Sequence, residues 1–520
     1  MEKSQLQEII KNCKSILATD QIKELQNQVP QYSWVLLLKL FDYYEKERGL
    51  LDKNFVTGIP EKFRWVDWAD TGDNSITGDA LSKFIQFELF PTLSELSPQK
   101  GAESRQVLAS TFSDFKQKVA SGTNLRLIVD EINKIKLDEP DTIPNLRDIY
   151  TEELVKWAND AEKTAYFFTP RAICKFIVSV IKPNFKNNEK VFDPASGLGG
   201  FLLESYNYMK GDVGPVEDLK KLRYESLIGQ DKNPEFFLCG VVNMMLNGID
   251  TPNMFNINSL VRPTKEILPE GEYEIVMSNP SYNEKEEKSI AMNNDIETGD
   301  TALHFLLLAM EELKEKGRGA VILPNGPLFG HNKADLVKNK LLDGFNLHTI
   351  VRLPSSIFKP RTSIDTNILF FEKGTPTKEI WFYDMPLPQR LEDESKKKKN
   401  LSFSKGKPVL DEDFTDVDVN AMISIITNDT NAYTKNPIIQ IALLQFLSTD
   451  KETARVALVK LEYDLLIAPP KAPEPEPMPG ISLGEAKLSF LAELYESGVV
   501  DKYADVIART IKRFTKHRGL

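Results

Sequence analysis

From about residue 165 onward, the sequence alternates between short apolar runs and longer helical patterns. The apolar runs are "KVFDPA", "SLIGQD", "YEIVMSNP", "GAVILP", "LHTIVRLP", "NILFFEKG" and "EIWFYDM". Between them lie helical candidates such as "RAICKFIVSVI", in which one face collects Ile173, Phe176, Ile177 and Val180. Buried strands that alternate with helices are typical of a doubly wound α/β fold, so we expect a mostly parallel sheet of seven strands. The last two runs, separated by "GTPTK", are candidates for a terminal hairpin.

Helical patterns flank this α/β region on both sides. In "WVLLLKLFDYYEKE" the apolar residues fall at helical spacing, namely Trp34, Leu37, Leu38 and Phe41. Past residue 400 the pattern is helical again, interrupted by the stiff proline-rich stretch "APPKAPEPEPMPG". We therefore predict a helical N-terminal domain (1–160), an α/β domain (161–410), a helical extension (411–467), a proline-rich linker (468–480) and C-terminal helices (481–520) that dock on a partner.

Composition limits the classes of protein that need to be considered. A chain of 520 residues is too long for one core, and no apolar run reaches the roughly 18 residues of a membrane span. The cysteines Cys13, Cys174 and Cys239 lack CxxC spacing, which favours a reducing cytoplasm without disulfides or a zinc site. His304, inside an apolar run, is expected to pack or to form a hydrogen bond rather than to bind metal. The net charge of −11 implies that any work on nucleic acid needs local basic patches or a partner, and Lys396–Lys399 is expected to be a solvated loop.

A glycine loop follows the first predicted strand in "KVFDPASGLGGFLLES". Asp193 ends the strand, and Gly197, Gly199 and Gly200 precede a helix. Glycines let the backbone turn tightly and come close to a ligand, and a strand, loop and helix of this kind bind nucleotide-like cofactors. Because neither GxGxxG nor a P-loop lysine is present, we expect an adenosine cofactor without phosphates.

A carboxylate follows the second predicted strand. Asp231 ends "SLIGQD", 38 residues beyond Asp193, where it is well placed to accept both ribose hydroxyl protons. The spacing exceeds the roughly 20 residues of dinucleotide folds, and the polar stretch "MKGDVGPVEDLKKLRYE" accounts for it as a loop insertion. Taken alone, Asp231 is explained as well as an acid at the N-terminus of the next helix.

The strand "YEIVM" runs into Asn279, Pro280, Ser281 and Tyr282. An Asn-Pro turn that stops a strand is one explanation. Strand ends in open parallel sheets also hold ligands, and an amide beside an aromatic ring suits a flat nitrogenous base. Asn279 and the Pro280 carbonyl would accept the hydrogens of an exocyclic amine, and Tyr282 would stack on the base rotated out of a duplex. Methyl transfer from a sulfonium then needs positioning and dipoles, but no metal.

Taken in order, these segments resemble the modification subunits of type I restriction–modification systems, which are adenine-N6 DNA methyltransferases. The matching stretches are "YFFTPRAICKFI", "DPASGLGGFL", "GQDKNP", "NPSY" and "AVILPNGPLFG…LHTIVRLPSSIF…TNILFFEKG", and "WVLLLKLFDYYEKE" resembles the family's helical N-terminal domain. The likeness covers roughly residues 30 to 385. It implies a Rossmann-like methyltransferase domain that uses S-adenosylmethionine, flanked by an all-helical N-terminal domain and a helical C-terminal tail.

The resemblance also implies roles for individual residues. Cofactor contacts fall on Tyr166, Phe167, Phe168, Thr169, Pro170, Arg171, Asp193, Ser196, Gly197, Leu198, Gly199, Gly200, Asp231 and Asn258, and the catalytic motif is Asn279, Pro280, Ser281 and Tyr282. No metal is implied. The chain departs from the family pattern at Ser281, where a second proline is usual, at Leu198, where Thr or Ser is common, and at Ala165 and Tyr166, which replace Gly-Gln.

The resemblance further implies partners. They are double-stranded DNA, a specificity subunit flanked by two modification subunits, and a motor-nuclease subunit, in the cytoplasm and not on a membrane. Two alternatives remain open at this point. Asn-Pro-x-Tyr also serves enzymes that methylate glutamine amides in proteins, and Ser281 is compatible with a scaffold that binds cofactor without catalysis.

Overall fold

The computed structural model describes residues 1–51, 55–69, 75–99, 102, 104–160, 169–214, 216–261, 271–281, 300–325, 333–354, 357–358 and 364–385. All of them belong to one compact unit, Met1–Leu458. The predicted extension (411–467), linker (468–480) and C-terminal helices (481–520) lie outside the described residues, as does Lys396–Lys399. These four expectations remain predictions.

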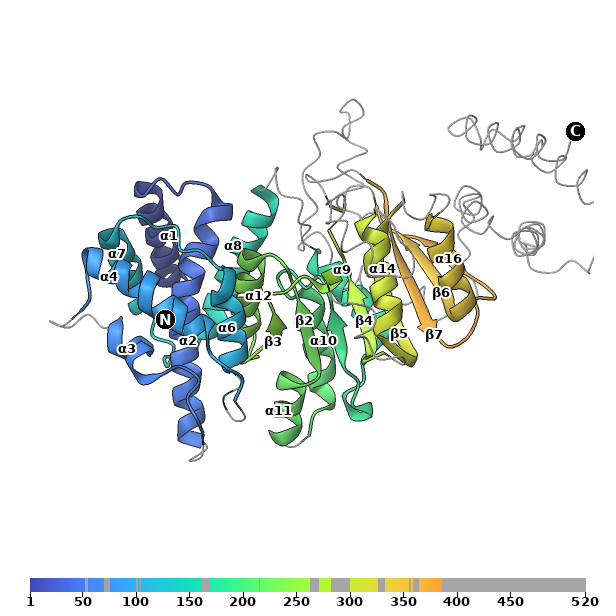
Figure 1. Cartoon of the computed structure of the whole chain (residues 1–520), viewed down its shortest axis with the longest axis horizontal. Coiled ribbons are helices and arrows are strands. Elements are labelled where there is room, and N and C mark those ends of the chain that lie inside the picture. Colours follow the sequence, from blue (N-terminus) through green and yellow to red (C-terminus); the bar gives the residue numbers. More distant parts are fainter. Residues whose placement is uncertain are drawn as a thin grey trace, which may run out of the picture. The chain divides into compact units, whose positions relative to one another are not determined.

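The N-terminal region is a bundle of helices (blue to teal in Figure 1). Its elements are α1 (Lys3–Thr19), α2 (Leu25–Leu51), α3 (Trp65–Trp68), α4 (Gly78–Phe84), a π-helical turn (Ile85–Leu89), α5 (Phe90–Ser94), α6 (Ser104–Asp114), α7 (Gly122–Asn133) and α8 (Thr142–Asp160). The apolar stripe expected in α2 is buried, since Trp34, Leu37, Leu38 and Phe41 are all at most 1% exposed. The burial extends beyond this stripe, since Val35, Leu36 and Leu40 are also fully buried, so this part of α2 packs on more than one side.

The described residues after the N-terminal bundle form one mixed sheet and the helices that cover it. Its strands are β1 (Val191–Asp193), β2 (Leu227–Gln230), β3 (Asn253–Phe255), β4 (Tyr273–Ser278), β5 (Leu313–Pro324), β6 (Phe345–Arg352), β7 (Thr366–Lys373) and β8 (Trp381–Asp384). The order across the sheet is β3-β2-β1-β4-β5-β7-β6-β8. All neighbouring pairs are parallel except β5–β7 and β7–β6, which are antiparallel. The doubly wound α/β expectation is confirmed.

Two details of the sheet differ from the sequence-based expectation. All seven predicted runs form strands, but the sheet has eight, because β3 adds a short edge strand beside β2. The hairpin expected between the last two runs is wrong. Strand β7 is already paired on both sides, with β5 and β6, so β8 pairs in parallel with the remaining edge of β6.

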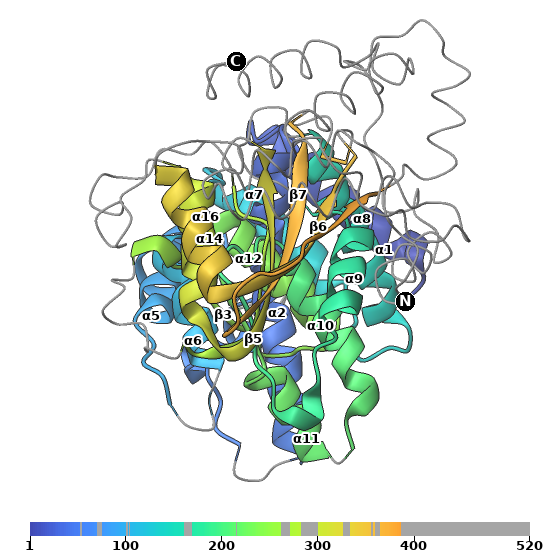
Figure 2. The ribbon, with the colours of Figure 1, turned by 90° about the vertical axis from the view of Figure 1, so that its right-hand side faces the viewer.

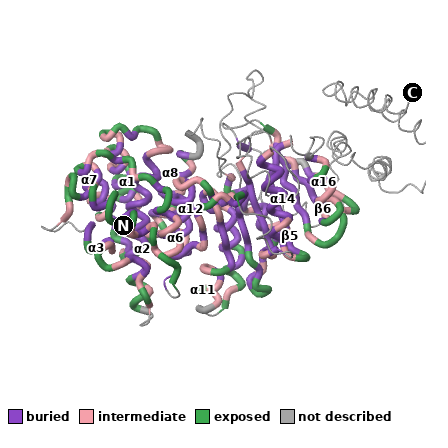
Figure 3. Tube along the Cα trace, viewed as in Figure 1, coloured by how far each residue is buried: buried purple, intermediate pink, exposed green. Residues whose placement is uncertain are grey.

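Helices cover the two faces of the sheet, and alternate strand residues feed two separate cores. Within β4, Ile275 and Met277 point into the first core, and Val276 points into the second. The first core also holds apolar residues of α9 (Arg171–Ile181), α10 (Gly200–Met209), α12 (Pro234–Leu246) and the N-terminal helices; the second holds those of α14 (Thr301–Glu312) and α16 (Lys333–Gly344). The strands are correspondingly buried (Figure 3). The first core is therefore continuous from the helical bundle to one face of the sheet.

None of the helices in the described part of the chain combines the length and the apolarity that a bilayer span requires.

The remaining labelled helix, α11 (Val216–Tyr224), lies between β1 and β2 in the sequence, within the stretch expected to be a loop insertion. Figure 2 shows the sheet turned by 90°, with α9 and α10 on one side of it and α14 and α16 on the other.

Candidate active site

The polar residues singled out in the sequence gather at one edge of the sheet. Strands β2, β1 and β4 are parallel neighbours, so their carboxyl ends lie side by side. These ends carry Asp231, Asp193 and Asn279, all less than a tenth exposed. In open α/β sheets ligands bind beyond the carboxyl ends of strands, so this edge is the candidate site.

The glycine loop closes back onto the end of β2. The Ser196 amide and hydroxyl both donate to the Gln230 carbonyl, at 2.8 and 3.2 Å, and the Gly197 amide donates to Asp231 Oδ2 at 2.8 Å. Gly197 and Gly199 have φ values of +51° and +80°, in the left-handed region where a side chain is strained. The sequence therefore folds into a tight loop that contacts the end of β2 through the Ser196 and Gly197 amides and the Ser196 hydroxyl.

Asp231 closes this loop with its carboxylate. Its Oδ1 accepts from the Asn233 amide at 2.8 Å, and its Oδ2 accepts from Gly197. A carboxylate has about four acceptor positions, so two backbone bonds are compatible with further donors such as ribose hydroxyls. The alternative role, an acid capping the next helix, falls to Asn233 instead, whose side chain accepts from Glu235 and Phe236 amides, each at 2.9 Å.

Asp193 is the most deeply buried of the three residues at the strand ends, at 1% exposure. Its carboxylate accepts from the Ala195 amide at 3.1 Å. Burial raises the pKa of Asp193 well above its ordinary value, and the nearby Asp231 carboxylate raises it further, against the lowering effects of the Ala195 amide and the Ser278 hydroxyl. The buried carboxyl of Asp193 therefore ionises less readily than a solvent-exposed one.

One hydrogen bond joins the Thr-Pro segment to the acceptor motif, 110 residues away along the chain. The Asn279 amide nitrogen donates to Thr169 Oγ1 at 2.9 Å. Thr169 is fixed in turn because Pro170 is the N-cap of α9 and its carbonyl accepts from Ile173 and Cys174 amides. With the nitrogen donating to Thr169, the amide oxygen of Asn279 is its acceptor atom at this edge, beside Pro280.

The other expected site residues have different surroundings. Arg171 donates from Nε to Glu204 of α10 at 2.6 Å, so its side chain ties two helices together. Leu198 is buried, and half-buried Asn258 accepts from the Leu260 amide at 3.1 Å, just past β3. Gly200 begins α10. Tyr166, Phe167, Phe168 and Tyr282 lie outside the described residues, so their assigned roles remain predictions.

Sequence reasoning missed the support of the glycine loop by α12. The Asn243 side-chain nitrogen donates to the Leu198 carbonyl at 2.9 Å. Gly240 lies directly under the loop, since a Cβ there would come within 2.6 Å of the Gly197 carbonyl oxygen. The signal was present in "FFLCGVVNMML", where one glycine and one asparagine interrupt a helix that is otherwise apolar.

The expectation for histidine and cysteine is compatible with the structure. His304 is buried in α14 at 2% exposure, and the three cysteines, all among the described residues, are buried and not joined in disulfides. Within the described ranges, no group of three or more His, Cys, Asp and Glu side chains is arranged to hold a metal ion.

A mostly parallel α/β sheet with a glycine loop after its first strand, an acid after its second and Asn-Pro after its fourth defines a methyltransferase of the Rossmann-like class. The sequence profile of the N-6 DNA Methylase family matches residues 142–437. The methylase subunit of the type I restriction enzyme EcoEI from Escherichia coli is 36% identical over 412 residues, which are 78% of this chain and 81% of that protein. The chain therefore belongs to the N-6 DNA methylase family of adenine-specific DNA methyltransferases, among the methylase subunits of type I restriction enzymes.

Solved structures agree with this assignment. A modification subunit of a putative type I restriction enzyme from Vibrio vulnificus YJ016 has a TM-score of 0.68 and 31% identity, covering 83% of this chain and 91% of that one. A chain from a structural study of the assembly and conformational transition of a type I restriction–modification system has the same TM-score of 0.68 at 29% identity, covering 99% of this chain and 98% of that one.

Proposed function

We propose that this chain transfers a methyl group from S-adenosylmethionine to the N6 amine of an adenine flipped out of double-stranded DNA. The observation that carries the proposal is the hydrogen bond of 2.9 Å between Thr169 and Asn279, because it joins the cofactor segment and the acceptor motif at one sheet edge. Family membership makes adenine N6 the expected acceptor. The finer assignment of residues below is part of the proposal.

The residues at the ends of β1 and β2 fit an adenosine cofactor. Backbone at Gly197 has open space where a side chain would project, and the Asp231 carboxylate beside it suits a ribose diol. No lysine of a P-loop accompanies the loop, which matches a cofactor without a pyrophosphate. When bound, S-adenosylmethionine supplies an electrophilic methyl group on a sulfonium centre. Thr169 and Pro170, next to Asn279, are the candidates for its methionine end.

The acceptor residues do the work of holding one amine. The lone pair of an exocyclic amine is delocalised into the ring, so the nitrogen is a weak nucleophile. The Asn279 amide oxygen and the Pro280 carbonyl accept its two hydrogens, which favours the pyramidal form and aims the lone pair. Thr169 holds the Asn279 amide in the orientation that presents oxygen. Tyr282 is the sequence-based candidate for stacking on the flipped base.

The chain's membership of the type I family implies work inside a complex. We propose that two such subunits flank one specificity subunit, that a motor-nuclease subunit can join, and that residues 481–520 dock on the specificity subunit. A net charge of −11 supports this division of labour, since sequence-specific binding of DNA by one chain usually needs a basic face.

The test is a methyl-transfer assay with radiolabelled S-adenosylmethionine and double-stranded DNA, with and without a cognate specificity subunit. Label in N6-methyladenine that depends on the specificity subunit is the expected result. Label in protein would instead indicate the glutamine methyltransferase alternative. Cofactor binding without transfer in every combination of subunits would indicate a scaffold and overturn the proposal.

A further inference from the structure

Helix α12 contacts both the glycine loop and the N-terminal helices. In Figure 1 it lies between the N-terminal helices and strands β2 and β3. On one side, Gly240 and Asn243 touch the backbone of the glycine loop. Met244 adds a third contact, since a Cβ at Gly199 would come within 3.1 Å of its sulfur. The loop therefore rests on this helix over a full turn.

The N-terminal helices hold α12 along its whole length. Near its start, the Trp157 ring of α8 stacks on Phe236 with centroids 4.5 Å apart. At the middle, the Cys239 thiol donates to Ser33 of α2 at 3.8 Å. Near the end, the Tyr44 hydroxyl donates to the Met245 carbonyl at 2.9 Å.

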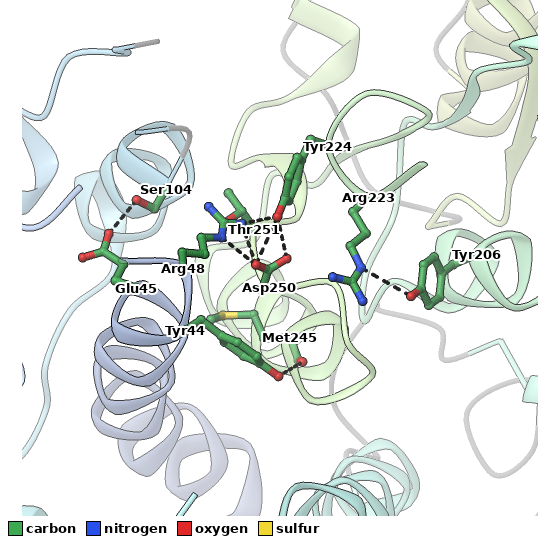
Figure 4. A network of polar contacts seen from close by, with 10 residues as sticks. All are labelled: Tyr44, Glu45, Arg48, Ser104, Tyr206, Arg223, Tyr224, Met245, Asp250 and Thr251. Carbon is green, nitrogen blue, oxygen red and sulfur yellow. Dashed lines mark hydrogen bonds and ion pairs between the residues drawn. The ribbon is translucent and has the colours of Figure 1, made fainter. Parts of the chain in front are cut away.

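A charged cluster fixes the chain just beyond α12 (Figure 4). Arg48 of α2 donates from Nε to Asp250 at 2.7 Å and from a terminal nitrogen to the Thr251 hydroxyl at 2.8 Å. The Tyr224 hydroxyl also contacts Asp250, at 3.1 Å to each oxygen, and its ring lies 4.8 Å from the Arg48 guanidinium carbon. The Arg48 and Asp250 side chains are 18% and 9% exposed, so solvent screens this pair little.

We propose that the N-terminal helical region sets the affinity for cofactor through α12. The Arg48–Asp250 pair and Tyr44 fix the position of α12, and Asn243 with Gly240 then fixes the glycine loop that binds the cofactor. The helical region is thus a positioning element of the cofactor site as well as a separate bundle. This inference rests on the proposed function, because it assumes that the glycine loop binds S-adenosylmethionine.

The direct test measures S-adenosylmethionine affinity of the full-length chain by calorimetry, with the melting temperature in parallel. Arg48→Met keeps the aliphatic stem and removes the guanidinium. The matched control is Arg126→Met, since Arg126 is buried and, like the half-buried Arg48, bonded to an acid, which here is Asp130 within the helical region. Both variants should melt earlier. Arg48→Met should weaken cofactor binding about tenfold, a typical size for coupling between sites, whereas Arg126→Met should stay within about twofold. Equal affinities of the two variants would overturn the inference.

A double-variant cycle tests whether Arg48 acts through Asn243. Asn243→Leu removes the bond to Leu198 at similar volume and should weaken cofactor binding by a similar factor. Adding Arg48→Met to Asn243→Leu should then change the affinity much less than it does alone, because coupled residues are not additive. Full additivity would contradict action through α12.

Hydrogen exchange of the cofactor-free chain separates failure of the inference from failure of the proposed function. The Gly197 and Gly199 amides, which donate to Asp231 and Ser196, should exchange faster in Arg48→Met than in Arg126→Met. If Arg48→Met does not fold, Tyr44→Phe, which lacks only one hydroxyl, should show the same acceleration to a smaller extent. Unchanged exchange would refute the inference, whereas a wild-type chain that binds no S-adenosylmethionine would refute the proposed cofactor.

Discussion

The two halves of the candidate site are built differently. In the cofactor half, at the ends of β1 and β2, each polar group also closes the structure: Asp231 accepts from the Gly197 and Asn233 amides. In the acceptor half, at the end of β4, Asn279 bonds to the side chain of Thr169, which comes from a distant segment. In the cofactor half, a carboxylate accepts from backbone amides of the glycine loop and of the N-cap of α12. In the acceptor half, the bond joins two side chains.

This difference has a consequence for substitution. A change in the cofactor half removes a ligand contact and a structural bond together, so stability and affinity should fall jointly. A change in the acceptor half can remove the chemistry while the sheet and its two cores stay as they are. The predictions below separate the halves by measuring turnover, affinity and stability on the same variants.

The largest effect is expected for Asn279→Ala. Under the proposed function, loss of the amide oxygen removes the acceptor for the amine hydrogens, so kcat should fall by about 100- to 1000-fold, as for loss of one preorganised polar group in other enzymes. The dissociation constant for S-adenosylmethionine should stay within a few-fold. Single-turnover transfer assays and calorimetry measure the two quantities, with the exposed Asn187→Ala as control. A parallel loss of turnover and cofactor affinity would place Asn279 in the cofactor half.

Asp231→Ala should lower the cofactor affinity and the melting temperature. Hydrogen bonds to a charged group contribute about 1.5–3 kcal/mol, so cofactor affinity should fall by about 10- to 100-fold. The melting temperature should fall too, because the Gly197 and Asn233 amides lose their acceptor. Calorimetry and thermal melting check both effects. The exposed Asp212→Ala should change neither, and a normal affinity in Asp231→Ala would rule out the ribose contact.

Thr169→Val tests the bond that connects the halves. Valine keeps the shape and removes the hydroxyl that accepts from Asn279. A hydrogen bond of this kind contributes about 0.5–1.5 kcal/mol, so kcat should fall by about 2- to 12-fold. Because Thr169 is also a candidate cofactor contact, the cofactor affinity should fall by no more than a similar factor. Thr169→Ser restores the hydroxyl and should recover most of the rate. If Thr169→Ser is as slow as Thr169→Val, the bond does not orient the amide.

Asp193, in the cofactor half, should make the stability of the chain depend on pH. Burial raises the pKa of the folded carboxyl above its unfolded value, so ionisation is opposed in the folded state only. Below the pKa of the unfolded carboxyl, Asp193 does not reduce the free energy of unfolding. As the pH rises from there through the pKa of the folded carboxyl, Asp193 lowers the free energy of unfolding. Asp193→Asn cannot ionise, and its amide oxygen can still accept from Ala195. It should therefore melt above the wild type near pH 8, and the difference should vanish near about pH 4. A difference that stays constant over this range would contradict the shifted pKa.

Most strands of the sheet, and the residues Asp231 and Asn279 of the two halves, were predictable from the sequence. Long apolar runs identify seven strands, whereas β3 is only three residues long with one buried residue, so it has no pattern of its own. The place of β8 was not predictable from local sequence, because it depends on which strand edge remains after β7 has paired twice. Asp231 and Asn279 stood out because each ends a strand.

Contacts between distant segments were beyond the sequence-based reasoning. Nothing local links Thr169 to Asn279, and Asn243 sits in a helix that looks like ordinary core. The same applies to Arg48, which has the appearance of a solvated residue at the end of α2 until Asp250 is brought beside it by the fold. These residues have roles that only the three-dimensional arrangement supplies.

The smallest effect concerns Ser281, where the family resemblance implies a second proline. Ser281→Pro fixes φ and reduces the freedom of the unfolded chain, which at a compatible position stabilises a protein by about 0.4–1 kcal/mol. Because the Asn279 oxygen and Pro280 carbonyl are unchanged, kcat should rise by no more than about threefold, a gain of under 1 kcal/mol in the barrier. Denaturant unfolding and single-turnover rates measure the two. Ser281→Ala, which keeps the amide N–H and loses the hydroxyl, should match the wild type. A large loss in Ser281→Pro with a normal Ser281→Ala would mean that the Ser281 N–H is used, and the acceptor half would then rely on a backbone bond as the cofactor half does.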